Sequence, residues 1–149
     1  MTSPLELGIG AIIAWATRAD VLREVMRRAN CTLPSGQVLL LSRLAEAGSS
    51  RIGEVAEALG IEKSTLTPKV QRLEGAGLVS RQPDPSDGRA SLLQVTRKGR
   101  ALLRRLEKHR GAMLRELLGD WPEADVDRAS TLLTRLGERV GRLPLSRHS

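Results

Sequence analysis

The chain has 149 residues and a net charge of +7, and its hydrophobic content of 40% excludes a wholly disordered protein. It contains no Phe or Tyr and only two Trp residues, so Leu, Ile, Val and Ala must form the core. This composition favours a mainly α-helical fold over an all-β sandwich, and it argues against a surface that stacks single-stranded nucleic acid.

The first predicted element is a helix over residues 5–29 whose apolar side chains change face partway along. A helix with two such stripes must be buried on two sides or bent, and the bend is predicted near Thr17–Asp20. The stretch 30–34 ends this helix. Ser35 is predicted to cap the N-terminus of the next helix, which runs to Leu44 or Ala45.

Two short amphipathic helices follow, over residues 53–59 and 63–75, and a turn at Gly60 joins them. Glycine permits the left-handed backbone that such a tight turn needs. Pro68 lies inside the second helix, where it would cost about 3 kcal/mol. We therefore predict that this helix begins late or irregularly, with its cap at Ser64 or Thr65.

The segments 78–82 and 91–95 flank a tip rich in Pro, Asp, Ser and Gly and are predicted to form a β-hairpin. Thr96 is placed to cap a helix that runs to Leu118, and Pro122 is predicted at the first position of a final helix. The apolar residues of that helix form a seam suited to packing against a partner helix. The seam comprises Val126, Ala129, Leu133, Leu136, Val140 and Leu143.

Positive charge is concentrated in one part of the chain. Between Lys63 and Arg100 there are eight basic and three acidic residues, whereas residues 1–62 carry six basic and seven acidic ones. Such a concentration is typical of a surface that binds phosphates. The alternative is a solvated basic face that has no partner.

The outer side of the predicted helix 63–75 carries hydroxyl, amide and cationic groups, with no acid between Lys63 and Arg72. The major groove of B-form DNA admits one α-helix, in which Gln71 can contact adenine and Arg72 guanine. Thr65 or Thr67 can contact a thymine methyl group or a phosphate. The candidate DNA-binding residues on this helix are Ser64, Thr65, Thr67, Pro68, Lys69, Gln71 and Arg72.

The hairpin contributes four further candidates: Arg81, Asp84, Asp87 and Arg89. Arg89 at the tip is predicted to enter the minor groove, where the negative potential attracts a guanidinium. Because carboxylates repel phosphates, Asp84 and Asp87 are predicted to brace Arg89 or Arg81 through charge-assisted hydrogen bonds. The alternative is an ordinary polar turn.

Residues 33–103 resemble the MarR (multiple antibiotic resistance regulator) family of bacterial transcription factors. The matching stretches are LPSGQVLLLSRLAEAG, IGEVAEALGIEKSTLTPKVQRLEGAGLVSRQPDPSDGRA and LLQVTRKGRALL, and the family's wing signature falls on Asp84, Asp87 and Arg89. The resemblance implies one MarR-like domain over residues 1–149. Its parts are a winged helix-turn-helix lobe over 33–99 and dimerisation helices over 5–30 and 100–143. A homodimer would bind a pseudo-palindromic operator in double-stranded DNA.

Members of this family commonly bind a small anionic or aromatic ligand between the dimerisation helices and the DNA lobe. The candidate ligand-pocket residues here are Trp15, Met26 and Arg110. The alternatives are core or interface packing for Trp15 and an intersubunit salt bridge or a snorkelling side chain for Arg110. The resemblance thus predicts a homodimeric repressor that a small-molecule ligand releases from DNA.

The sequence is also compatible with two other functions. One is a winged-helix module that binds proteins without specific DNA binding, and the other is a thiol-based redox regulator that uses Cys31. With one cysteine and two histidines, the sequence supplies no catalytic constellation, so we predict no enzyme, cofactor or metal site.

The location of the protein is also predicted from the sequence. Cys31 has no second cysteine with which to form an internal disulfide, which fits a reducing cytoplasm. The apolar run over residues 7–15 is too short to span a bilayer and lacks the basic flank of a secretory signal. We therefore predict a cytoplasmic protein with no membrane partner.

Overall fold

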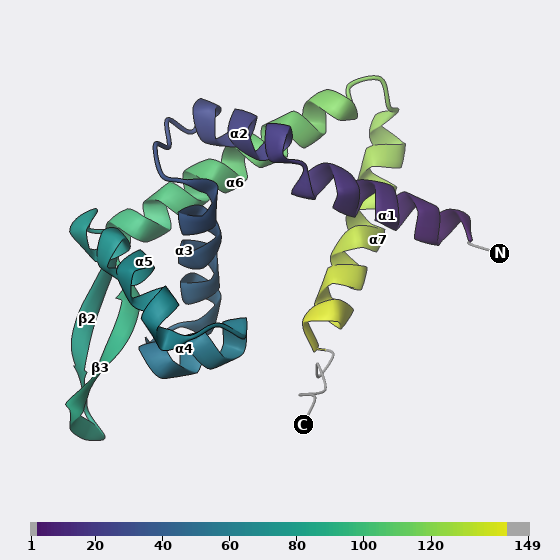
Figure 1. Cartoon of the computed structure of the whole chain (residues 1–149). Coiled ribbons are helices and arrows are strands. Elements are labelled where there is room, and N and C mark those ends of the chain that lie inside the picture. The colour runs from purple at the N-terminus through teal and green to yellow at the C-terminus, as the bar shows by residue number, and fades with distance from the viewer. Residues whose placement is uncertain (1–2, 143–149) are drawn as a thin grey trace. The chain divides into compact units, whose positions relative to one another are not determined.

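The computed structural model describes residues 3–142 and is mainly helical with a small antiparallel sheet, as predicted (Figure 1). The chain divides at Arg110–Gly111, inside α6, into two compact units. The prediction of one domain over residues 1–149 stays a prediction. The elements are α1 (Pro4–Thr17), α2 (Ala19–Arg28), α3 (Ser35–Ala47), β1 (Ser50–Arg51), α4 (Ile52–Leu59), α5 (Lys63–Gly75), β2 (Val79–Asp84), β3 (Asp87–Val95), α6 (Arg97–Leu117) and α7 (Glu123–Arg142).

The predicted bend in the N-terminal helix is a break between α1 and α2. Arg18 separates the two helices with an extended backbone, at φ −63° and ψ 133°. Most of the large apolar side chains of α1, among them Leu5 and Ile12, are exposed within the N-terminal unit, whereas Val21 and Val25 of α2 are buried. The change of apolar face therefore marks the point where the chain enters the core.

The start of α3 corrects one prediction. Ser35 is the first residue of the helix, and Pro34 takes the N-cap position without any side-chain hydrogen bond. The carbonyl of Pro34 instead accepts the backbone N–H groups of Gln37 and Val38. The fixed φ of proline, here −58°, already suits a helix entry, so no serine cap is needed.

Aliphatic side chains alone form the largest fully buried positions of the N-terminal unit, as the absence of Phe and Tyr predicts. They come from α2, α3, α5 and β3 and hold the helix-turn-helix against the sheet. These fully buried residues are Val25, Leu41, Leu44, Leu66, Val70, Leu73 and Leu93.

The turn between α4 and α5 is confirmed at Gly60, which has φ 64° and ψ 31°. The predicted late start of α5 is wrong, because the helix begins at Lys63 and contains Pro68 in its interior. Its backbone loses one hydrogen bond there, the one that a residue other than proline would donate to the Ser64 carbonyl. Complete burial of Leu66 and Val70 on either side of the proline offsets this loss.

The sheet has the strand order β1-β3-β2, with antiparallel pairing throughout. The hairpin of β2 and β3 is confirmed, and its strands extend further toward the tip than predicted, leaving two residues between them. The third strand, β1, was not predicted. It consists of Ser50 and Arg51, which pair with Leu93 and Leu92, and two polar residues carry no periodic signal.

Thr96 caps α6 as predicted, because its hydroxyl accepts the Gly99 N–H at 3.1 Å. In the C-terminal unit, Pro122 was predicted to be the first residue of the last helix, but α7 begins at Glu123, so Pro122 lies just before the helix. The carbonyl of Pro122 accepts the N–H groups of Asp125 and Val126. Leu143 of the predicted seam lies outside the described residues. Within residues 3–142, no helix is long and apolar enough to cross a membrane.

Candidate nucleic-acid interface

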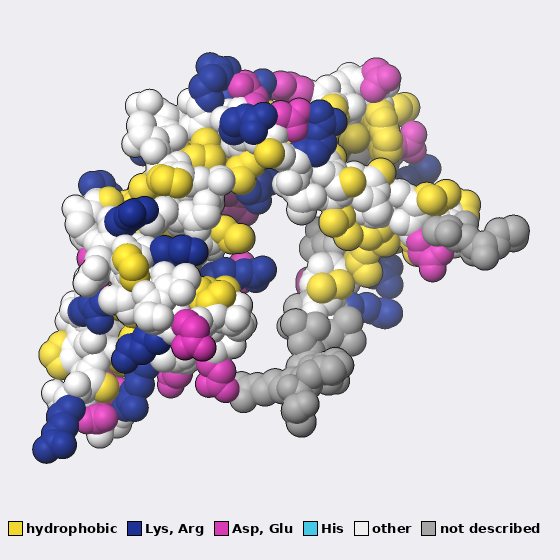
Figure 2. Space-filling view, in the orientation of Figure 1, with side chains coloured by type: hydrophobic (Ala, Val, Ile, Leu, Met, Phe, Trp, Pro, Cys, Tyr) yellow, Lys and Arg dark blue, Asp and Glu magenta, His cyan; other side chains and the backbone are white. Residues whose placement is uncertain are grey.

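The outer face of α5 carries the seven residues predicted from the sequence to contact DNA. Leu66, Val70 and Leu73 are fully buried and fix which side of the helix faces the core. Six of the seven selected side chains are exposed and Thr67 is half-buried. Lys and Arg side chains are spread over α5 and the hairpin on the face shown in Figure 2.

Three side chains on this face are unoccupied, in the sense that they have no partner among the described residues. In the described part of the chain, no hydrogen bond or ion pair engages the side chains of Lys69, Gln71 and Arg72. Thr67 differs, because its hydroxyl donates to the Lys63 carbonyl at 2.7 Å and so supports the first turn of α5. The unoccupied amide and cationic groups are therefore free to bind an external partner.

The hairpin tip is organised around Asp84. The Asp84 side chain is only 6% exposed, although it lies next to a two-residue turn. Its Oδ1 accepts both the backbone N–H of Ser86, at 2.8 Å, and the Ser86 hydroxyl, at 2.7 Å. Its other oxygen accepts Nε of Arg51 at 2.7 Å. Asp84 thus shapes the turn and is unavailable to an external partner.

This geometry corrects the predicted roles of the two aspartates. Neither carboxylate braces the side chain of Arg89 or Arg81. The Asp87 carboxylate accepts the backbone N–H of Arg89 at 3.1 Å, and it lies 3.9 Å from Nη1 of Arg51. Arg51, which the sequence analysis did not select, is the arginine that both aspartates face.

Arg81 also has a different partner from the one predicted. Its Nε donates to the Glu74 carboxylate at 2.7 Å, which ties β2 to the last turns of α5. Its Nη1 donates to the Ser91 hydroxyl across the hairpin at 3.4 Å. The base of the hairpin is therefore fixed to α5, while Arg51 holds the tip.

The electrostatics of the tip follow from these contacts. Hydrogen bonds from the Ser86 hydroxyl, the Ser86 N–H and Arg51 lower the pKa of Asp84 to about 2. The hydrogen bond that Arg51 donates to Asp84, together with the negative charge of Asp84, raises the pKa of Arg51 above its ordinary value. Both groups are consequently ionised throughout the physiological range of pH.

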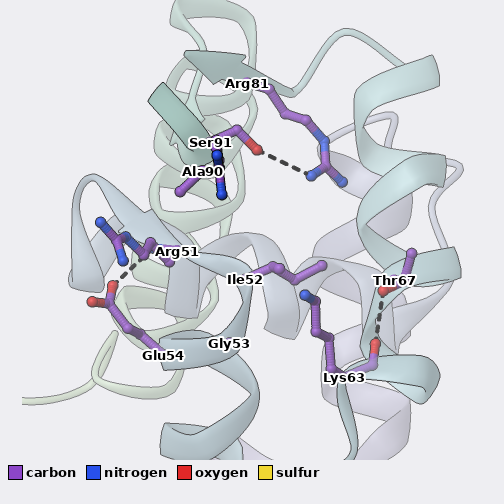
Figure 3. Close-up of a pocket in the computed structure, with 10 residues that line it drawn as sticks. Arg51, Ile52, Gly53, Glu54, Lys63, Thr67, Arg81, Ala90 and Ser91 are labelled. Carbon is purple, nitrogen blue, oxygen red and sulfur yellow. Dashed lines mark hydrogen bonds between the residues drawn. The ribbon is translucent and has the colours of Figure 1, made fainter. Parts of the chain in front are cut away.

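A cationic cleft of about 520 Å³ lies between the hairpin, α5 and the start of α4 (Figure 3). Its walls are residues 51–54, Lys63 and Thr67 of α5, and Arg81 with residues 89–91 of the hairpin. Arg81 is paired with Glu74, and the Glu54 carboxylate accepts the backbone N–H of Arg51 at 2.8 Å. Among the described residues, the side chains of Lys63 and Arg89 have no ionic partner. Two uncompensated cations therefore line this cleft.

We expect the contribution of Asp84 to stability to be constant near neutral pH. The pKa of Asp84 in the folded protein, about 2, lies below the value of about 3.9 for an unfolded chain. Ionised Asp84 therefore stabilises the fold fully above about pH 4, and this contribution is lost as the pH falls through about 2. The difference in unfolding free energy between the wild type and D84N should stay constant from pH 8 to 5 and narrow below pH 4. A difference that changes between pH 5 and 8 would contradict this assignment.

The three candidate ligand-pocket residues do not lie in the cationic cleft. Trp15 and Met26 are half-buried and Arg110 is exposed. A second cavity of about 200 Å³ contains Cys31 but none of these three residues. Their role in binding a ligand stays a prediction. Among the described residues, no cluster of His, Cys, Asp and Glu could hold a metal ion.

Two cationic residues of the cleft, Arg51 and Lys63, were not among the site residues predicted from the sequence. Arg51 precedes α4 and pairs with a residue 33 positions away, so no local pattern marks it. Lys63 belonged to the basic segment but was not selected as a contact. Its position at the start of a stretch that contains no acid as far as Arg72 was the signal that could have identified it.

Comparisons with known proteins agree with this geometry. Residues 33–91 match the family model described as the MarR family. The chain is 32% identical over 136 residues to the uncharacterized HTH-type transcriptional regulator YxaD of Bacillus subtilis (strain 168), covering 91% of this chain and 94% of the relative. It is 27% identical over 112 residues to the HTH-type transcriptional repressor IacR of Pseudomonas putida, covering 75% and 66%.

A solved structure is similar over nearly the whole chain. The crystal structure of the transcriptional regulator Tm0710 from Thermotoga maritima superimposes with a TM-score of 0.77 at 28% sequence identity. The match covers 95% of this chain and 96% of that one. The similarity therefore includes the helices that precede and follow the winged lobe in the sequence, as well as the lobe itself.

Proposed function

The chain belongs to the MarR family of transcriptional regulators, and on this premise we propose that it binds specific sites in double-stranded DNA through α5 and the β2–β3 hairpin. The observation that carries the proposal is the cationic cleft, with Lys63 and Arg89 as its two uncompensated cations. Beside it, the outer face of α5 presents unoccupied polar groups. Together they supply what duplex recognition needs: cations for the phosphates and hydrogen-bonding groups for base edges.

In this proposal the two parts of the interface do different work. The face of α5 enters the major groove, where Gln71 and Arg72 contact base edges and Ser64, Thr65 and Lys69 lie near the backbone. Arg89 extends from the hairpin into the adjacent minor groove. A phosphate group of the intervening backbone occupies the cationic cleft next to Lys63. Pro68 contributes shape to the helix surface and no hydrogen bond.

We propose that the functional form is a homodimer that binds a pseudo-palindromic operator. Apolar side chains are exposed on α1 within the N-terminal unit and on α7 within the C-terminal unit, and a second copy of the chain would cover them. Two recognition helices must lie about 34 Å apart to enter successive major grooves of one duplex. A dimer fixes that spacing.

We further propose that the protein is a cytoplasmic repressor released by a small anionic or aromatic ligand. The relative IacR is named a transcriptional repressor, which supports this direction of control. Trp15, Met26 and Arg110 are the residues proposed to contact the ligand. Release requires only a small rotation of the two lobes, because successive major grooves tolerate little change in spacing.

The test is binding to the DNA upstream of the protein's own gene, measured by fluorescence anisotropy as a function of salt. We expect a preference for this DNA over random duplex of the same length. R89A should weaken binding to all sequences and lower the magnitude of the slope of log affinity against log salt by about 0.9, because the variant brings one cation fewer to the DNA. Q71A and R72A should cost about 1–3 kcal/mol at particular base pairs.

R43Q is the matched control for the loss of one charge. Arg43 lies on α3, where it forms an exposed ion pair with Glu46 at 3.0 Å, and it does not line the cleft. The salt slope of R43Q should equal that of the wild type. Equal affinity for upstream and random DNA, or an affinity independent of salt, would overturn the proposal in favour of a protein-binding module.

A further inference from the structure

Arg51 occupies the junction between the sheet and the helix-turn-helix. It is the last residue of β1 and the residue that precedes α4. Its backbone N–H donates to the Glu54 carboxylate at 2.8 Å, which fixes Arg51 to the first turn of α4. Backbone pairing with Leu92 fixes it to β3. The main chain of Arg51 is therefore held from both sides.

The side chain of Arg51 reaches the hairpin tip. Its Nε donates to the Asp84 carboxylate at 2.7 Å, its Nη2 donates to the Ser86 hydroxyl at 3.4 Å, and its Nη1 lies 3.9 Å from Asp87. These partners are 33 to 36 residues away along the chain. One guanidinium thus contacts both aspartates and the turn between them.

These contacts continue to the backbone of Arg89. Asp84 shapes the turn by accepting the N–H and hydroxyl of Ser86. Asp87, which faces Arg51, accepts the backbone N–H of Arg89. A short series of polar contacts therefore leads from the start of α4 to the residue that bears the free guanidinium of the tip.

We propose that Arg51 is the positioning residue of the hairpin tip, holding Arg89 at a fixed place relative to α4 and α5 through Asp84. The proposal deepens the proposed function, on which its DNA-binding part rests. Arg51 acts here within the protein and makes no contact with phosphate of its own, because Asp84 and Asp87 compensate its charge. A guanidinium suits this task because its planar fork donates to two acceptors at once.

The first measurement uses the full-length protein without DNA. Amide hydrogen exchange at Ser86 and Arg89 is compared in the wild type, R51Q, R51K and R43Q. We expect at least about tenfold faster exchange at the tip in R51Q, equivalent to about 1.4 kcal/mol in the opening equilibrium. R51K keeps the charge but loses the planar fork, so its exchange rates should lie between those of R51Q and the wild type. The exchange rates of R43Q should match those of the wild type. Unchanged exchange in R51Q would overturn the proposal.

The second measurement is a double-mutant cycle on affinity for the upstream duplex. D84N removes the charge that holds Arg51 but keeps an oxygen that can accept the Ser86 N–H. If Arg51 acts through Asp84, R51Q should weaken binding about tenfold in the wild type and have little further effect in D84N. The salt slope should be the same in R51K and the wild type. Additive effects of R51Q and D84N, with a reduced salt slope in R51Q, would show a direct phosphate contact and overturn the proposal.

The two measurements separate this proposal from the proposed function. If the wild type shows no preference for the upstream duplex, the proposed function fails, while the exchange rates still decide whether Arg51 positions the tip. If R89A weakens DNA binding but R51Q leaves both exchange and affinity unchanged, the proposed function stands and the role of Arg51 is wrong. Cooperative thermal unfolding of each variant shows that the fold is retained.

Discussion

Replacing Gly99 with alanine is expected to lower the free energy of unfolding by about 3 kcal/mol, because the core at this point has no room for a methyl group. A Cβ at Gly99 would lie 2.3 Å from the Leu78 carbonyl oxygen and 2.7 Å from Cγ1 of Val95. The Leu78 carbonyl cannot move away without disturbing a hydrogen bond, since it also accepts the Thr96 N–H at 2.9 Å. The Thr96 hydroxyl in turn donates to the Gly77 carbonyl at 2.7 Å.

The direction of the change in unfolding free energy distinguishes a steric clash at Gly99 from an effect of helix propensity. Helix propensity alone favours alanine over glycine by about 1 kcal/mol in a helix interior, so without the contact G99A would stabilise the protein. Gly36, in the first turn of α3, provides the matched control, because a Cβ there meets no atom within 4 Å. Urea denaturation should show G36A unchanged or stabilised by up to about 1 kcal/mol and G99A strongly destabilised. A G99A protein as stable as the wild type would contradict the close packing of α6 on Leu78.

The parts of the fold that the sequence predicted are those specified by neighbouring residues. The turn at Gly60 depends on one residue's freedom to adopt positive φ, and the cap at Thr96 depends on a bond to a residue three positions away. The break between α1 and α2 was visible as a change of apolar face. Each signal lies within one or two turns of the feature it specifies, so one sequence suffices to find it.

The predictions that failed depend on residues that are distant in sequence or on packing. Pro68 has an intrinsic cost that favours a late start of α5, but burial of Leu66 and Val70 decides the outcome. The strand β1 exists because Ser50 pairs with Leu93, 43 positions further along the chain. Propensity and periodicity report on single elements and carry no information about such partners.

The candidate interface shows the same division. The outer face of α5 followed from helical spacing, and the structure exposes most of the residues selected there. The roles of the charged hairpin residues did not follow, because composition counts charges without showing which are paired. Arg81 is compensated by Glu74 and Arg51 by Asp84, whereas Lys63 and Arg89 have no ionic partner in the described chain. The position of the unpaired cations identifies the cleft more precisely than the net charge.

Replacing Leu133 with aspartate is expected to prevent dimerisation and to reduce affinity for a two-half-site operator by about a hundredfold or more. The Leu133 side chain is 49% exposed on α7, in a seam that continues through Leu136 and Val140, so folding of the isolated chain does not need it. A buried aspartate in a dimer interface would leave an unpaired charge. Without a partner, each lobe binds alone and loses the gain in effective concentration that linked binding gives, about 10²–10⁴.

Sedimentation equilibrium and anisotropy with full and half operators would measure both effects. L39D is the control, because Leu39 is 61% exposed on α3, in the N-terminal unit and outside the seam. It should leave both the dimer and the affinity unchanged. L133D should bind a half operator as tightly as the wild-type protein does, since its α5 and hairpin are untouched, and should lose only the advantage of the second half-site. A dimeric L133D, or a monomer that binds the full operator with wild-type affinity, would show that α7 does not join the two copies and that another surface sets the spacing of the recognition helices.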